Sequence, residues 1–163
     1  MTLRVAAVAL LLLTAACSGR AAPPTAPIPV TITLLTAQAS FGSYLTDDAG
    51  RALYMWDADR DGSSTCYGDC ATAWPPLTVG DAAHAGPGVD SSLIGTVTRK
   101  DGTHQVTYGG WPLYTFIGDS AAGQTKGQAF EKEWYVVNTS GALVKSAVAA
   151  PTPTTTSGGS AWG

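Results

Sequence analysis

The chain has 163 residues, of which 45% are hydrophobic and 13% are charged, and its formal net charge at pH 7 is −3. The charge and the lack of a Lys/Arg cluster exclude a nucleic-acid binder that works by counterion release. Only one long apolar run occurs, at the N-terminus, and this excludes a protein that crosses a membrane several times, because each span needs about 20 apolar residues.

The N-terminus predicts a lipoprotein signal peptide over residues 1–16. A positively charged start precedes the apolar run 5–13, and three small residues stand directly before Cys17. In such a signal Cys17 becomes the first mature residue, and diacylglycerol and palmitate chains on it anchor the protein stably to the membrane. An ordinary secretory signal with an incidental cysteine is the alternative. Residues 17–29, rich in Ala and Pro, are expected to form a tether beyond the lipidated cysteine.

An internal repeat organises the rest of the chain. An offset of 60 residues places the window 42–77 on the window 102–137, and each window carries a Tyr-x-aromatic-x-x-Asp motif. The shared framework pairs Tyr54 with Tyr114, Trp56 with Phe116, Asp59 with Asp119 and Trp74 with Trp134. Neither half could bury its aromatic face alone, so we expect the two halves to pack on each other.

The local pattern between residues 30 and 146 predicts strands and turns. Strands are expected at residues 43–46, 51–56, 94–99, 103–108, 112–116, 134–137 and 142–144, with turns at Asp101-Gly102 and similar Gly-containing segments between them. Leu53 and Met55 alternate with Tyr54 and Trp56, and this period of two places the aromatic side chains on one face. The fold class is therefore all-β, a small antiparallel barrel or sandwich of two pseudo-symmetric repeats.

Three other segments have less regular patterns. Residues 81–92, rich in Ala, Ser and Gly, are expected to connect the halves, and residues 66–74 to form a short helix. Residues 147–163 predict a disordered Thr/Pro/Gly tail, whose composition would permit O-glycosylation.

The run from Gly50 to Leu77, with its Tyr-x-Trp-x-x-Asp, its cysteine pair and its Trp-Pro-Pro-Leu, resembles the bacterial secreted-repeat lipoproteins defined by a Yx[FWY]xxD motif. The second half agrees, with Gly-Trp-Pro-Leu-Tyr at residues 110–114, so the resemblance covers about residues 42–138. The molecular function of that family is uncharacterised. The resemblance therefore implies an envelope location and a duplicated domain, and it implies no catalytic residues.

Cys66 and Cys70 are the two thiols that remain when Cys17 is lipidated. A pair outside the cytoplasm is most simply a disulfide. In a helix, a spacing of four puts the Cα atoms about 6 Å apart, which a disulfide tolerates. Two alternatives stay open: a thiol-redox couple and a soft-metal site, although zinc would want four ligands and no nearby Cys or His completes the set.

Asp57, Asp59 and Asp61 open a D-x-D-x-D-G sequence, in which alternate carboxylates converge on calcium. The match then fails, because position 12 is Gly68 instead of a bidentate Glu. A weak calcium site is one hypothesis, and calcium is the one cofactor that the sequence suggests. The alternative hypothesis for these acids is that Asp59 holds a turn, in an architectural role that it shares with Asp119.

The repeated aromatic residues would bind sugar rings if they lay on an open face, whereas aromatic residues at matching positions of two packed halves are typical of a core. No catalytic constellation occurs in the sequence, so no enzyme is expected. We expect a lipid-anchored, extracytoplasmic module on the outer face of the cell membrane that binds or scaffolds a cell-wall polymer or an envelope protein. The alternative is an extracytoplasmic thiol-redox or electron-transfer-associated protein that uses Cys66 and Cys70.

Overall fold

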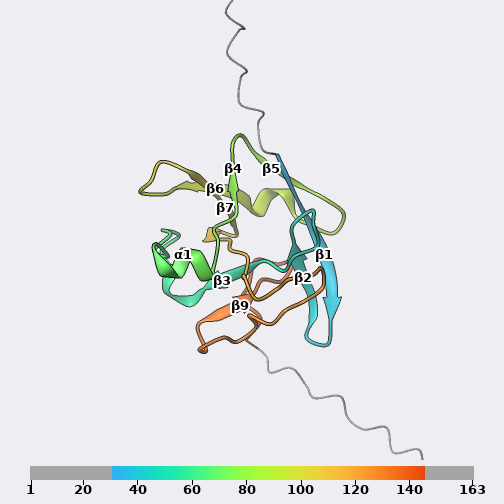
Figure 1. Ribbon diagram of the computed structural model, residues 1–163. Coiled ribbons are helices and arrows are strands. Elements are labelled where there is room, and N and C mark those ends of the chain that lie inside the picture. The colour runs from blue at the N-terminus through green and yellow to red at the C-terminus, as the bar shows by residue number, and fades with distance from the viewer. Residues whose placement is uncertain (1–30, 146–163) are drawn as a thin grey trace, which may run out of the picture.

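A computed structural model describes residues 31–145, and strands dominate it (Figure 1). In chain order the elements are β1 (Ile32–Ala39), β2 (Gly42–Thr46), β3 (Tyr54–Trp56), the 3-10 helix η1 (Asp57–Asp59), α1 (Asp69–Ala73), β4 (Thr78–Val79), β5 (Ala83–Ala85), the 3-10 helix η2 (Ser91–Leu93), β6 (Ile94–Thr98), β7 (His104–Tyr108), β8 (Trp111–Pro112) and β9 (Trp134–Val136). The predicted mostly-β fold of two repeats is confirmed.

Each repeat begins with a hairpin. In the first repeat β1 pairs antiparallel with β2, from Leu35 opposite Thr46 to Ala39 opposite Gly42. In the second, β6 pairs with β7 around the predicted Asp101-Gly102 turn. The Asp101 carboxylate accepts a hydrogen bond from the Thr103 backbone N–H at 3.0 Å, and Gly102 supplies the positive φ of 84° that the turn requires.

A pseudo-two-fold axis passes between Tyr54 and Tyr114. The backbone N–H of each donates to the carbonyl oxygen of the other, at 2.8 and 3.0 Å. Further out, the bond from Asp57 N to Glu133 O at 2.8 Å has its counterpart in the bond from Ile117 N to Ala73 O at 3.0 Å. The chain thus repeats its hydrogen bonds as well as its residues, at the predicted offset of 60.

The gap-free alignment is wrong in one strand. Leu53 N donates to Leu45 O, whereas the equivalent donor, Leu113 N, donates to Val106 O. Strand β2 therefore corresponds to β7 with an offset one residue longer than the offset of 60 that relates the other parts of the two repeats. The turns on either side of these strands absorb the difference, because hairpin loops tolerate changes in length that the paired strands do not.

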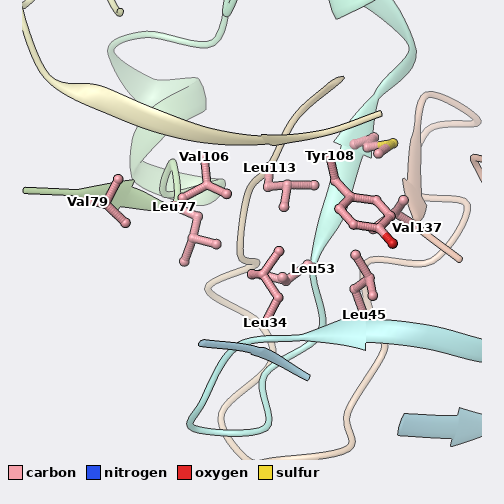
Figure 2. Packing of buried hydrophobic residues seen from close by; sticks show 10 residues of the cluster. Leu34, Leu45, Leu53, Leu77, Val79, Val106, Tyr108, Leu113 and Val137 are labelled. Atoms are coloured by element: carbon pink, nitrogen blue, oxygen red, sulfur yellow. The ribbon is translucent and has the colours of Figure 1, made fainter. Parts of the chain in front are cut away.

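Strand β3 lies between two cores. Leu53 and Met55 pack into an aliphatic core, whereas Tyr54 and Trp56 face an aromatic core, as the period-two alternation predicts. The aliphatic core comprises Leu34, Leu45, Leu53, Met55, Leu77, Val79, Val106, Tyr108, Leu113 and Val137, and Figure 2 shows side chains from several strands converging there. The aromatic core comprises Tyr44, Ala52, Tyr54, Cys66, Trp74, Tyr114, Trp134, Val136 and Val144.

The sheets do not close into a barrel. Hydrogen bonding divides them into β2-β1-β5, β3-β9 and β4-β7-β6, with β8 added to β7. The expected connection 81–92 contains β5, which pairs parallel to β1, and the 3-10 helix η2. The helix expected at 66–74 is restricted to Asp69–Ala73.

Within residues 31–145 no helix has the length and apolar character needed to cross a membrane. The predicted signal peptide, Cys17, the tether and the tail from residue 147 lie outside the described residues.

Candidate functional site

The motif tyrosines and aspartates exchange partners between the repeats. The Tyr54 hydroxyl donates to Asp119 Oδ2 at 2.6 Å, and the Tyr114 hydroxyl donates to Asp59 Oδ2 at 2.6 Å. All four side chains are buried. The Tyr and the Asp of one motif therefore never pair with each other, and we call this arrangement the tyrosine–aspartate exchange.

The second carboxylate oxygen of each Asp holds a loop of its own repeat. Asp59 Oδ1 accepts the Thr65 backbone N–H at 3.0 Å, and Asp119 Oδ1 accepts the Lys126 backbone N–H at 2.9 Å. Each carboxylate thus fixes one loop and receives one tyrosine from the other repeat. This is an architectural role that both copies share.

Burial raises the pKa of Tyr54 and of Tyr114 well above the ordinary value for tyrosine, and the hydrogen bond that each donates to a carboxylate raises it further. A tyrosinate beside a buried carboxylate would be a like-charge pair, so both tyrosines are held as neutral donors. They are consequently unsuited to act as bases or nucleophiles near neutral pH.

Four aromatic rings of the motifs form one stack. Trp74 and Trp134 lie parallel at its centre, with ring centroids 4.0 Å apart. Trp56 stacks on Trp134 at 5.1 Å, and Phe116 stacks on Trp74 at 4.2 Å. Each outer ring therefore rests on the tryptophan of the other repeat, and the stack obeys the same pseudo-two-fold axis.

The stack places most of the candidate sugar-binding rings in the core. Trp74 and Trp134 are each 3% exposed, and the outer rings of Trp56 and Phe116 are half-buried. Trp56 also donates its indole N–H to Glu133 Oε2 at 3.0 Å. Rings that stack on one another leave little aromatic face for a sugar, so we interpret these four rings as part of the core.

Sequence reasoning missed a buried arginine. The Arg99 guanidinium donates through Nη1 to Gln105 Oε1 at 2.7 Å and to the Ser64 hydroxyl, and through Nη2 to the Cys66 carbonyl oxygen at 2.8 Å. Its carbon lies 4.3 Å from the Tyr67 ring centroid. The sequence signal was slight: a basic residue at the end of a strand.

The arginine is connected to the exchange on one side only. The Ser64 hydroxyl lies 2.8 Å from the Tyr114 hydroxyl, so the guanidinium, the serine, the tyrosine and the Asp59 carboxylate form one chain of hydrogen bonds. This chain links a buried cation to a buried anion through two neutral groups. At the offset of 60 the first repeat has Ala39 in place of the arginine.

The predicted Cys66–Cys70 disulfide is confirmed, with Cα atoms 5.3 Å apart. Cys66 is fully buried in the aromatic core, and Cys70 packs at its edge. In the second repeat Lys126 and Phe130 occupy the corresponding positions. The Phe130 ring contacts Trp74, with centroids 5.7 Å apart.

The structure does not bring together the three acids of the calcium hypothesis, because each faces a different partner. Asp57 forms ion pairs with Arg60 and with Lys145, and the hydrogen bond from Lys145 is the main cause of a lowered pKa of the Asp57 carboxyl. Asp59 points into the tyrosine–aspartate exchange, and Asp61 accepts the Ser63 N–H at 2.9 Å. Within residues 31–145 no three His, Cys, Asp or Glu side chains form a group that could hold a metal ion.

An open surface hollow of about 370 Å³ lies between the β1–β2 turn and residues 138–145. The Asn138 side chain, which lines the hollow, accepts the backbone N–H groups of Ser140 and Ala142 at 3.0 and 2.9 Å. Since these bonds hold the chain's own turn, the amide oxygen is occupied.

The comparisons with known proteins agree with the internal symmetry. A family model described as a secreted repeat of unknown function matches residues 35–78 and again residues 95–138, together more than half of the chain. Neither a curated protein nor a solved structure matches significantly. The two matched segments contain the hairpins, the motifs and the stacked tryptophans described above, and the chain therefore belongs to this family of secreted repeats.

Proposed function

We propose that this protein is a lipid-anchored module of the cell envelope, held on the outer face of the membrane by Cys17, that binds or scaffolds without catalysis. Its ligand class is a cell-wall polymer or another envelope protein. The family is one of secreted repeats, and the Cys66–Cys70 disulfide suits the oxidising conditions outside the cytoplasm.

The observation that carries the non-catalytic part is the tyrosine–aspartate exchange. A catalytic acid or base needs an accessible proton and a substrate within hydrogen-bond reach. The buried acids Asp59 and Asp119 instead face tyrosines of the opposite repeat and the backbone of their own loops. The residues that define the motif therefore join the two halves, and a rigid body of this kind can present its surface at low entropic cost.

The lipid anchor is tested by comparing the full chain with its Cys17→Ser variant in living cells that are fed a clickable palmitate analogue. Wild type is expected to incorporate the label and to sediment with membranes. The variant is expected to lose the label and to appear in the medium or as an uncleaved precursor. A Ser18→Ala variant is the matched control, and acylation of the Cys17→Ser protein would refute the anchor.

The binding role is tested with the same processed protein. Intact cells are treated with an amine-reactive cross-linker, and purified walls are mixed with the detergent-solubilised protein. Enrichment on walls supports a polymer ligand, and a discrete cross-linked species supports an envelope protein. Turnover of wall fragments by the purified protein would refute a non-catalytic role.

A thiol-redox function is the second candidate, and the partial exposure of Cys70 at helix α1 favours it, because an external thiolate needs access to one sulfur. Equilibration with dithiothreitol buffers distinguishes the two functions. A reduction potential below about −300 mV is typical of a structural disulfide, and one near −200 mV is typical of a redox-active one.

A further inference from the structure

One end of the aromatic stack carries exposed apolar side chains. Within residues 31–145 the large apolar side chains with substantial exposure are Ile117, at 66%, and Phe130, at 41%. Phe130 lies against the outer ring of Phe116, with centroids 5.7 Å apart, and Ile117 follows Phe116 in the chain. We call Phe116, Ile117 and Phe130 the apolar end.

The first repeat shows that the fold does not need an apolar residue at this place. Ile117 corresponds to Asp57, and the backbone N–H of each donates to an equivalent carbonyl oxygen, of Ala73 and Glu133 respectively. Asp57 nevertheless carries a charge and pairs with Lys145 at 2.9 Å. The same backbone thus accepts an ion-paired carboxylate, so the fold does not require an isoleucine at this place in the second repeat.

The loop that presents Phe130 is strained and firmly held. Ala129, Glu131 and Lys132 have φ values of 59°, 50° and 60°, in the left-handed region that L-residues avoid. Gln128 fixes this loop, because its side-chain amide donates to Val144 O at 2.6 Å and accepts from Val136 N at 2.8 Å. Left-handed residues on both sides of a half-exposed phenylalanine indicate a side chain held in place for a contact.

The charges beside the apolar end favour a copy of the same chain as the partner. Glu131 and Lys132 follow Phe130, both are exposed, and neither forms an ion pair within residues 31–145. Neighbouring charges of opposite sign are self-complementary: about a two-fold axis, Glu131 of one copy faces Lys132 of the other. A strongly acidic or basic partner would leave one of the two charges against a like charge. An aliphatic side chain beside the rings also suits apolar packing better than a sugar.

We propose that the apolar end is a self-association surface on which a second copy of this chain packs in an isologous two-fold dimer. Phe130 and Ile117 form its centre, and Glu131 and Lys132 pair across the axis. The patch is smaller than a standard interface, so the dimer is weak, with a dissociation constant of about 10 to 100 µM. The proposal rests on the described domain alone and does not depend on the lipid anchor.

The test is sedimentation equilibrium of the chain from Ser18 to Gly163, which omits the signal peptide and the lipidated Cys17, from about 5 µM to about 1 mM. Wild type is expected to pass from monomer to dimer. Ile117→Asp, which installs the residue of the first repeat, should raise the dissociation constant at least about tenfold. Thr96→Asp, at an exposed position of β6, is the matched control and should leave it unchanged. Near-UV circular dichroism of each variant reports whether the aromatic stack is intact.

Charge reversal separates a two-fold contact from any other. Glu131→Lys alone and Lys132→Glu alone should each weaken the dimer, because like charges then meet across the axis. The double variant E131K/K132E restores opposite charges and should regain the wild-type dissociation constant. A monomer throughout the concentration range would overturn the proposal, as would a dimer that Ile117→Asp does not weaken or a double variant without rescue.

Discussion

Removing one tyrosine hydroxyl tests whether the motif joins the two repeats. In Tyr54→Phe the Asp119 carboxylate, 6% exposed, loses a donor at 2.6 Å that water cannot readily replace. A hydrogen bond to a charged group contributes about 1.5–3 kcal/mol to stability. For a β domain of this size, that loss lowers the melting temperature by roughly 4 °C per kcal/mol.

The pairing itself is measured by double-mutant cycles in urea. Tyr54→Phe combined with Asp119→Ala should show a coupling free energy of about 1.5–3 kcal/mol, because both changes remove the same bond. Tyr54→Phe combined with Asp59→Ala should be additive within about 0.5 kcal/mol, although these two residues belong to one motif. Coupling in the second pair and additivity in the first would refute the tyrosine–aspartate exchange.

Three further changes test the surrounding structure. Unfolded tyrosine ionises near pH 10, whereas Tyr54 and Tyr114 keep their protons when folded, so their contribution to stability is constant below pH 10. Above about pH 10 stability should fall by about 1.4 kcal/mol per pH unit for each of them. Urea titrations from pH 8 to 11.5 measure this slope, and a Tyr54→Phe variant with the same slope would contradict it. Replacing Cys66 and Cys70 by alanine should lower the free energy of unfolding by about 2 kcal/mol, because a short disulfide loop removes about that much chain entropy from the unfolded state. Urea unfolding of the reduced wild-type protein should show an equal loss, and an unchanged free energy would contradict this prediction. Lys145→Met should change stability by less than about 1 kcal/mol, because its ion pair is exposed, and a larger loss of urea stability would show that the pair is coupled to the core.

The duplicated framework could be predicted because its signals are local or strictly periodic. The alternation of Leu53, Tyr54 and Met55 assigned these side chains to opposite faces, and both faces proved to be buried in separate cores. The offset of 60 identified the equivalent residues of the two halves. The sequence did not predict that each tyrosine pairs with the aspartate of the other repeat. A tyrosine and an aspartate five residues apart suggest a local contact. The two-fold axis that pairs them across the repeats is a property of the three-dimensional fold.

Elements that depend on distant partners were missed. Strand β5 contains Ala83, His84 and Ala85, residues with no β-pattern of their own, and it forms because β1 offers an edge for parallel pairing. The buried Arg99 is stabilised by Ser64 and by the Cys66 carbonyl oxygen, more than thirty residues away. Long-range partners of this kind leave no trace in residue spacing.

The orientation of the three acids in the calcium hypothesis also depends on the fold. Spacing places Asp57, Asp59 and Asp61 as a calcium loop would, yet spacing says nothing of where each carboxylate points. The 3-10 helix η1 turns Asp59 inward to Tyr114 and leaves Asp57 outside with Lys145. Once Asp59 receives a buried tyrosine it is no longer available to a cation, because both of its oxygens are hydrogen-bonded within the protein.

The two repeats differ where the shared architecture no longer constrains them, and this bears on where a function should be sought. The tyrosines, the aspartates and the central tryptophans obey the pseudo-two-fold axis, because changing one member leaves a buried partner unsatisfied in the opposite repeat. Ile117 stands where the first repeat has Asp57, and Phe130 stands where it has Cys70, and the backbone bonds around the stack are the same in both repeats. One end of the stack is therefore charged and closed by ion pairs, and the other is apolar and open. Because the shared fold does not require this difference, the apolar end is the place to look for a partner.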